Sequence, residues 1–244
     1  MKLAPTPQTH TSPENWDDLP WGMHYQTALE RALAPWWPRV FGFHLLKIGA
    51  LSNAIVTDSC AITHQVNISL YPANNVHVLA APYQLPFSKK SVDACLLAHT
   101  LSYSSDPHRI LREVDRVLIN DGWLFLSGFN PISLLGAGKL TPGLRQYQPY
   151  CARMCTQMRM VDWLALLNYE VLRQGSFHIV PWKMPQEAIA LELHSTPLGC
   201  LTLLIARKRT IPLTIYSLRQ KLNKLSVGRA VGATKSYRKK IKPL

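Results

Sequence analysis

Charge is scarce in this chain, and acidic residues are absent from its C-terminal part. Only 17% of the 244 residues are charged while 47% are hydrophobic, which is enough to bury a sizeable core and excludes wholesale disorder. No Asp or Glu follows Glu192. Residues 207–244 hold 12 of the 27 Lys and Arg residues, leaving 15 basic against 14 acidic residues elsewhere. We therefore expect a nearly neutral domain at 1–206, loose over 1–18, and a basic, disordered tail at 207–244.

Cysteines are few and long apolar runs are missing. The five cysteines are odd in number and scattered in spacing, which excludes a disulfide framework and a zinc site, and predicts free thiols in a reduced compartment. The longest apolar run, near 201–206, is far below the roughly 18 residues that a membrane span needs. The first 19 residues contain one Lys and no apolar stretch, unlike a signal peptide. We expect a soluble, cytoplasmic protein.

Short apolar runs alternate with helical patterns along most of the chain. Asp106 and Pro107 are typical of a helix start, and an apolar stripe continues from there to Leu118. Such alternation predicts an α/β fold, a mostly parallel sheet with helices on both faces. The expected helices are 23–33, 107–118 and 153–167. The expected strands are 43–48, 64–68, 76–80, 92–98, 123–127 and 169–172, with an antiparallel pair at 176–181 and 201–207.

Ligands of such sheets bind outside the carboxyl ends of the strands, where the strand order reverses. The loops after Ile48, Ile68, Ala80, Ala98 and Ser127 are therefore the places to look for a site. Absence of an obvious catalytic triad there does not argue against activity, since some group transfers depend mainly on alignment.

Three ordered segments carry a resemblance to a known family. They are 85–93, which opens with Leu-Pro-Phe, then 106–118, a helix with Asp-Pro at its start and Arg-Val-Leu at its end, and 121–127, a glycine turn into a strand. Together they resemble type 11 class I methyltransferases, and the wider chain is similar to enterobacterial methyltransferase-like proteins. The resemblance implies a Rossmann-like class I methyltransferase sandwich with a seven-stranded sheet and an antiparallel last strand. It also implies S-adenosylmethionine (SAM) as cofactor and methyl transfer by direct displacement to an unidentified acceptor.

The family's polar anchors for SAM differ here at three strand ends. Lys47 stands where the family has an acid before its glycine-rich loop, and this reverses the sign of charge offered to the cationic ligand. Asn67 falls where an acid holds the ribose hydroxyls, and 80–83 contains no carboxylate for the adenine amino group. The cofactor-binding residues that the resemblance predicts are Lys47, Gly49, Ala50, Asn67, Ala81, Pro82 and His99.

His99 is the candidate catalytic residue, just past a predicted central strand. It could contact the cofactor or act as a base, and the competing interpretation is a structural imidazole bonded to a loop carbonyl. Three functions remain in view. The first is an active methyltransferase. The second is a binding module on the same fold, which the missing anchors favour and which would hold another small ligand, RNA or a protein. The third, a nicotinamide-dependent dehydrogenase, lacks its glycine fingerprint.

The basic tail suggests a second kind of contact. Its density of Lys and Arg is typical of segments that bind nucleic acid or anionic lipid through phosphates, with strong salt dependence. A solvated tail that aids solubility is the alternative. Few aromatic residues lie among these charges, which argues against sequence-specific readout.

Overall fold

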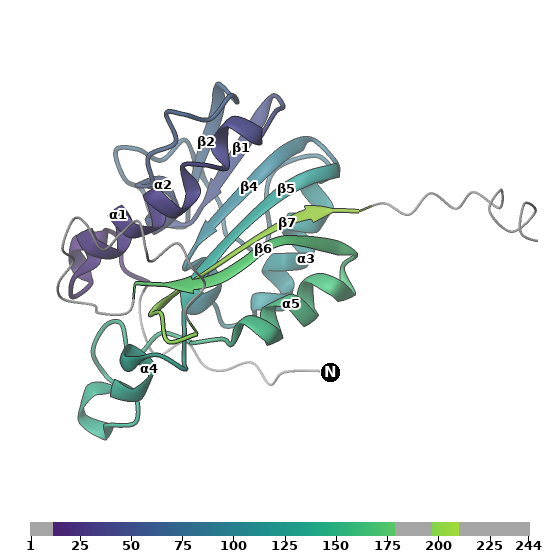
Figure 1. Ribbon diagram of the computed structural model, residues 1–244. Helices are drawn as coiled ribbons and strands as arrows, with labels where there is room; N and C mark the ends of the chain where they lie inside the picture. The colour runs from purple at the N-terminus through teal and green to yellow at the C-terminus, as the bar shows by residue number, and fades with distance from the viewer. Residues whose placement is uncertain (1–11, 179–196, 210–244) are drawn as a thin grey trace, which may run out of the picture. The chain divides into compact units, whose positions relative to one another are not determined.

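A computed structural model describes residues 12–178 and 197–209, and everything structural below refers to them (Figure 1). Seven strands form one sheet in the order β3-β2-β1-β4-β5-β7-β6. The strands are β1 (His44–Ile48), β2 (His64–Ser69), β3 (Val78–Leu79), β4 (Val92–Ala98), β5 (Leu118–Phe129), β6 (Tyr169–Phe177) and β7 (Leu201–Lys208). The α-helices are α1 (Gly22–Leu33), α2 (Ala50–Asn53), α3 (Pro107–Val117), α4 (Leu134–Gly138) and α5 (Gln157–Leu166). Short 3-10 turns are η1 (Trp16–Asp18), η2 (Trp37–Arg39), η3 (Thr100–Tyr103) and η4 (Pro142–Leu144).

The topology confirms the expected class I methyltransferase sheet. β1 pairs in parallel with β2 and β4, and β4 with β5, whereas β7 runs antiparallel to both β5 and β6. The chain adds β2 and β3 on one side of β1 and returns to place β4 on the other side. The strand order therefore reverses between β1 and β4, and their carboxyl ends form the expected ligand site.

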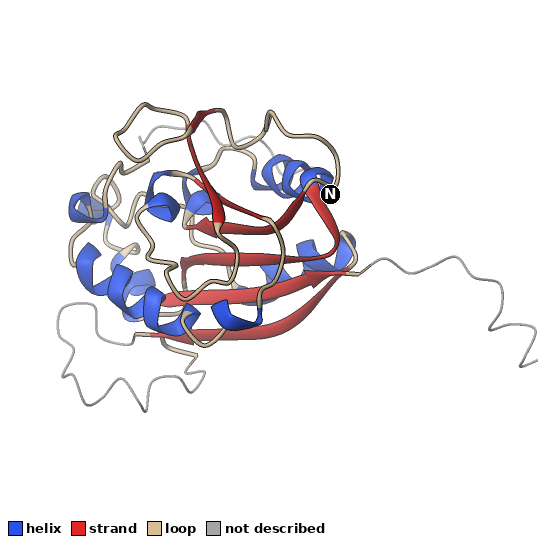
Figure 2. Ribbon diagram, turned by 90° about the horizontal axis from the view of Figure 1, so that it is seen from above, coloured by secondary structure: helices blue, strands red, loops and turns tan. Residues whose placement is uncertain are grey.

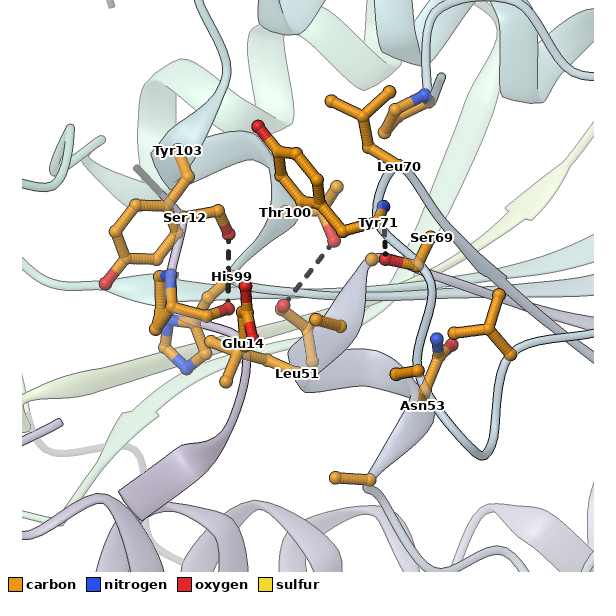
Figure 3. A pocket seen from close by; sticks show the side chains of 18 of the residues that line it. Ser12, Glu14, Leu51, Asn53, Ser69, Leu70, Tyr71, His99, Thr100 and Tyr103 are labelled. Carbon is orange, nitrogen blue, oxygen red and sulfur yellow. Dashed lines mark hydrogen bonds between the residues drawn. The ribbon is translucent and has the colours of Figure 1, made fainter. Parts of the chain in front are cut away.

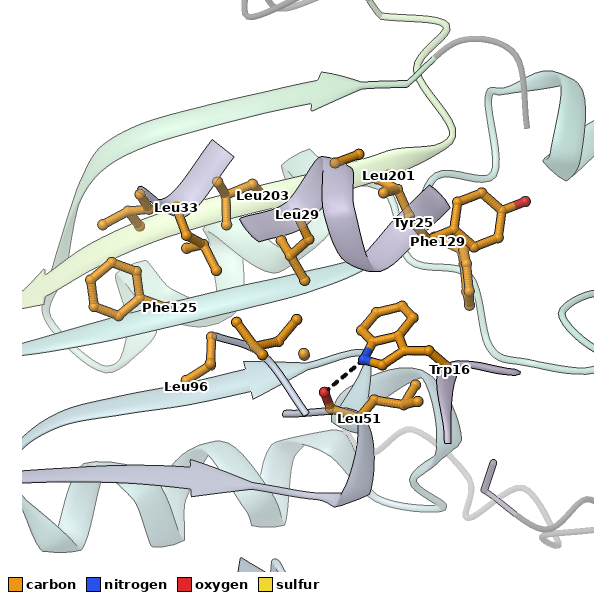
Figure 4. Close-up of a cluster of buried hydrophobic side chains, with 14 of the residues drawn as sticks. Trp16, Tyr25, Leu29, Leu33, Leu51, Leu96, Phe125, Phe129, Leu201 and Leu203 are labelled. Atoms are coloured by element: carbon orange, nitrogen blue, oxygen red, sulfur yellow. Dashed lines mark hydrogen bonds between the residues drawn. The ribbon is translucent and has the colours of Figure 1, made fainter. Parts of the chain in front are cut away.

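Helices cover both faces of this sheet (Figure 2). On one face α1 lies across the central strands, where Leu29 and Leu33 are buried in one cluster with Phe125 and Leu203 (Figure 4). On the other face α3 and α5 bury a second cluster, which includes Val114 from α3. Alternate residues of the central strands enter the two clusters, as a strand covered on both faces requires.

The family signature holds α3 against the loop that precedes β4. The Asp106 side chain accepts a hydrogen bond from the backbone of Arg109 at 3.1 Å, which confirms the predicted helix start. Glu113 accepts from the backbone nitrogen of Leu85 at 2.8 Å. Arg116 donates to the carbonyls of Leu85 and Phe87, each at 2.9 Å, and to Glu113. These motif residues are therefore structural ties.

Several boundaries differ from the sequence prediction. α5 begins at Gln157 and not near Arg153, because the Thr156 side chain caps it. β5 begins directly after α3, at Leu118, and continues through the turn expected at 120–122. The two strands predicted at 169–172 and 176–181 are one strand, β6, whose pairing with β7 confirms the antiparallel pair. Residues 179–181 of that prediction lie outside the described residues.

The expected loose N-terminal segment is wrong over residues 12–18. Trp16 is 2% exposed and packs into the core, so this stretch, here called the N-terminal strap, lies against the domain. Residues 207 and 208 belong to β7, and Lys208 contacts Asp115 at 2.9 Å. The division into domain and tail stays a prediction, since 210–244 lie outside the described residues. No helix in the described ranges is long and apolar enough to cross a membrane.

Candidate functional site

A cavity of about 210 Å³ opens where the carboxyl ends of β1 and β4 meet (Figure 3). Its lining comes from loops that follow four different strands, and from the N-terminal strap. Among the described residues, those that line it are 12–15, 49–51, 53–54, 69–73, 75–76, 82–83, 98–100, 103–105 and Ile110.

The floor of the cavity ties β1 to β4. Gly49 has φ +97°, and a Cβ there would lie 2.7 Å from Thr100 Oγ1. Thr100 Oγ1 donates to the Ile48 carbonyl at 2.5 Å. Ser52 Oγ donates to the same carbonyl and accepts from the backbone nitrogen of Ala98, each at 2.7 Å. Glycine is thus required at 49 both by its backbone angle and by a close neighbour.

Lys47 does not line the cavity. Its Nζ donates to the Ile55 carbonyl at 2.9 Å, behind the loop that carries Gly49 and Ala50, and its side chain is 7% exposed. Burial lowers the pKa of the Lys47 ammonium, although Asp58 and other acids nearby oppose that shift. The Lys47 ammonium, which the sequence interpretation placed beside the ligand, therefore binds a backbone carbonyl of the protein.

β2 ends at Ser69, one residue later than predicted and two residues beyond Asn67. β2 continues to Ser69, which lines the cavity, whereas Asn67 does not. The Asn67 amide donates to the Asn75 carbonyl at 2.8 Å and so holds the loop that forms this wall. Ser69 Oγ accepts from the backbone nitrogen of Tyr71 at 3.2 Å, which leaves its hydroxyl hydrogen to donate. Ser69 is therefore the residue at the end of β2 that faces the cavity.

The third loop contributes apolar and aromatic contacts. Pro82 and Tyr83 line the cavity, but Ala81 does not. The Tyr83 ring is 43% exposed, and the Arg109 guanidinium lies 4.7 Å from its centre. This arrangement holds the ring at the cavity wall and supplies no carboxylate, as the sequence predicted.

His99 combines burial with unused hydrogen-bonding capacity. It lines the cavity, is 0% exposed and has φ +56°. Its ring lies 5.4 Å from the Trp16 ring and 4.2 Å from that of Phe129. Neither ring nitrogen has a hydrogen-bond partner among the described residues, so the expected bond to a loop carbonyl is absent there. Burial lowers the pKa of His99 to about 3. A neutral imidazole with so low a pKa is a hydrogen-bonding group and a weak base.

The N-terminal strap was missed by the sequence interpretation as a source of site residues. Trp16 Nε1 donates to the Leu51 carbonyl at 3.0 Å and fixes the strap beside the loop after β1. Glu14, two residues earlier, is the single charged side chain among the described residues of the lining. The signal available in the sequence was one large aromatic residue in a polar stretch that resembles a disordered terminus.

The structure thus brings together four of the seven predicted cofactor residues. Gly49, Ala50, Pro82 and His99 line the cavity, while Lys47, Asn67 and Ala81 lie outside its lining. Within 12–178 and 197–209 no group of three or more His, Cys, Asp or Glu side chains could hold a metal ion.

Comparison with known proteins agrees with this fold. The methyltransferase domain family matches residues 44–126. YafS of Escherichia coli (strain K12), described as an uncharacterized protein, is 55% identical over 239 residues, which cover 98% of this chain and 99% of YafS. A chain from the complex of the Haloferax volcanii Trm112 methyltransferase activator with a methyltransferase has a TM-score of 0.56 at 15% identity, covering 77% of this chain and 91% of that chain. A SAM-dependent methyltransferase from Thermotoga maritima has a TM-score of 0.52 at 16% identity, with coverages of 77% and 95%.

Proposed function

This chain belongs to the YafS family and carries a methyltransferase domain whose cofactor is SAM, and from that premise we propose that the cavity between β1 and β4 is its SAM site. The observation that carries the proposal is the place of the cavity, at the carboxyl ends of β1 and β4 where the strand order reverses. The ring nitrogens of His99 have no partner among the described residues, but they have almost no accessible surface, because the Trp16 and Phe129 rings lie against this imidazole.

The other groups of the cavity fit the same cofactor. The Ser69 hydroxyl can donate to a ligand at the end of β2, since its oxygen accepts from the backbone nitrogen of Tyr71. Gly49 keeps a Cβ out of the loop after β1, which lets a ligand approach the backbone. The described lining contains no Lys or Arg, and this suits a cation and disfavours the pyrophosphate of a nicotinamide dinucleotide.

SAM, when bound, supplies a methyl group on a sulfonium, which a nucleophile can take by direct displacement. The protein's part in such a reaction is to align the acceptor and to exclude water. His99 does not supply a general base, because burial lowers its pKa and closes its ring nitrogens off from the cavity. We therefore propose an acceptor that is already a good nucleophile at neutral pH and needs little help from a general base.

A binding module on the same fold is the second candidate. It is favoured by one observation: no carboxylate from the ends of β1, β2 or the third loop enters the described lining. Each lost charged hydrogen bond weakens binding by about 1.5–3 kcal/mol, so three such losses would lower the affinity for SAM by orders of magnitude. Such a module would hold another small ligand, RNA or a protein partner.

Calorimetric titration of the full chain with SAM and with its demethylated product, S-adenosylhomocysteine, separates the two. The methyltransferase proposal expects micromolar binding of both ligands. Absence of heat up to millimolar SAM would contradict it and leave the binding module. If SAM binds, incubation with isotopically labelled SAM and candidate amines, thiols and nucleic acids then identifies the acceptor.

The basic tail is proposed as a second contact surface for the acceptor or a partner. Residues 210–244 carry nine Lys and Arg and no acid, which supports attraction to phosphates of nucleic acid or of an anionic surface. Titration of the full chain with single-stranded RNA at two salt concentrations tests this. If the tail contacts phosphates, the chain should bind the RNA with an affinity that falls steeply as the salt concentration rises. Absence of RNA binding at low salt would contradict the proposal.

A further inference from the structure

The cavity is lined by one charged side chain among the described residues, and that side chain comes from outside the strand ends. It is Glu14, on the N-terminal strap. The family resemblance led us to expect negative charge at the end of β1, where Lys47 stands and bonds away from the cavity. The site therefore still has a negative charge, but the N-terminal strap supplies it and the end of β1 does not.

The strap holds Glu14 in a defined position. Asp18 Oδ2 accepts hydrogen bonds from the backbone nitrogens of Glu14 and Asn15, both at 2.9 Å. Two residues after Glu14, the buried Trp16 indole donates to the Leu51 carbonyl at 3.0 Å. The chain from Glu14 to Trp16 is thus held beside the loop after β1.

The Glu14 side chain is exposed, and its carboxylate has no hydrogen bond or ion pair with any described residue, whereas Asp18 Oδ2 on the same strap accepts two hydrogen bonds. Figure 3 shows the Glu14 side chain in the part of the cavity where His99 and Leu51 are drawn. Trp16 contacts both of these residues, through its indole nitrogen and its ring edge, which places the strap at this end of the cavity. An anion without a partner at the wall of a cavity that otherwise lacks charge is a site for a cationic group.

We propose that Glu14 binds the α-ammonium group of SAM. This inference rests on the proposed SAM site. Of the two cationic groups on SAM, only the ammonium carries N–H donors that a carboxylate can accept, whereas a sulfonium offers charge alone. The strap thereby supplies the carboxylate that the end of β1 lacks.

The test compares three ligands that differ in the proposed contact. SAM has both cations, S-adenosylhomocysteine keeps the ammonium but has a neutral sulfur, and methylthioadenosine lacks the amino-acid part altogether. Calorimetry with the full-length Glu14→Gln variant should give dissociation constants about tenfold higher than wild type for SAM and for S-adenosylhomocysteine. The dissociation constant for methylthioadenosine should not change.

Asp17→Asn is the matched control, because Asp17 is an exposed acid on the same strap that does not line the cavity. It removes the same charge from the protein and should leave all three affinities unchanged. Thermal unfolding of both variants should match wild type, since each side chain is exposed.

Each other result overturns the inference in a recognisable way. An equal loss for all three ligands would mean that Glu14 only positions the strap. Weaker binding of SAM but not of S-adenosylhomocysteine would mean that the carboxylate contacts the sulfonium. Unchanged affinities for all three ligands would mean that Glu14 does not contact the ligand. Failure of wild type to bind SAM, by contrast, would overturn the proposed function and this inference together.

Discussion

Trp16 Nε1 donates a hydrogen bond to the backbone carbonyl of Leu51 over 3.0 Å, and this contact joins the N-terminal strap to the loop after β1 (Figure 4). The bond spans 35 positions of the chain, and it holds residues 12–15 of the strap beside Leu51 in the lining of the cavity. The same indole is buried in the core cluster under α1. Stability of the strap and shape of the proposed cofactor site are therefore linked through one side chain.

Trp16→Phe should lower both the stability and the affinity for SAM. The variant keeps an aromatic ring but leaves the Leu51 carbonyl without its donor, which costs about 1–3 kcal/mol of unfolding free energy. Trp37→Phe is the control, because Trp37 is equally buried and its Nε1 has no partner among the described residues. Urea unfolding should place Trp16→Phe below Trp37→Phe. Equal losses would show that the hydrogen bond contributes nothing beyond packing.

Gly49→Ala should disturb the floor of the cavity. The new Cβ meets Thr100 Oγ1 at 2.7 Å, and φ of +97° is unfavourable for alanine, so we expect a loss of about 1–3 kcal/mol in unfolding free energy. SAM affinity, measured by calorimetry, should fall as well. Gly143→Ala is the control, since nothing lies within 4 Å of a Cβ there.

A double variant separates the contact from the backbone strain. If the Thr100 contact matters, Gly49→Ala combined with Thr100→Ala should cost less than the sum of the two single changes. Strict additivity would leave only the backbone angle as the cause.

The sequence predicted most accurately those helices and strands whose bounds depend on neighbouring residues. β4 was predicted at its observed bounds because a nearly continuous apolar run marks a strand covered on both faces. α3 was predicted from the Asp106 cap and Pro107, whose effects act within one turn. The methyltransferase-type sheet followed from the spacing of such segments and from the family resemblance.

The site was predicted only in part, because its remaining features depend on contacts distant in sequence. Spacing of about 20 residues from the glycine loop assigned the ribose-binding position to Asn67, but the strand continues two residues further, to Ser69. No local pattern could show that the Lys47 side chain turns to the Ile55 carbonyl. Nor could composition show that Trp16 brings a polar terminal segment back to the loop at Leu51.

Ser69→Asp should tighten the binding of adenosine-containing ligands. It places a carboxylate at the observed end of β2, where the resemblance implies an acid that accepts from both ribose hydroxyls. The new side chain can still accept from the backbone nitrogen of Tyr71, as Ser69 does at 3.2 Å. We expect about a tenfold lower dissociation constant for SAM by calorimetry. Asn67→Asp, at the position that the sequence favoured but outside the lining, should bring no gain. A gain from Asn67→Asp instead would return the ribose side to the earlier assignment.

His99→Asn should flatten the dependence of stability on pH. Burial lowers the pKa of His99 to about 3 in the folded chain, against about 6.5 when unfolded. Between these values the unfolded state binds the extra proton, so acidification destabilises the native state by about 1.4 kcal/mol per pH unit through this residue. The contribution is fully present above pH 6.5 and is lost as the pH falls toward 3.

Asparagine is suited to this test because it tolerates the positive φ of residue 99 and does not titrate. Unfolding free energies measured in urea from pH 7 to pH 4.5 should fall less steeply for His99→Asn than for wild type. The difference in slope isolates His99 from every other titrating group. Parallel curves for His99→Asn and wild type would mean that His99 binds its proton equally well in the folded and the unfolded chain. Burial of a neutral imidazole beside the cavity would then be wrong.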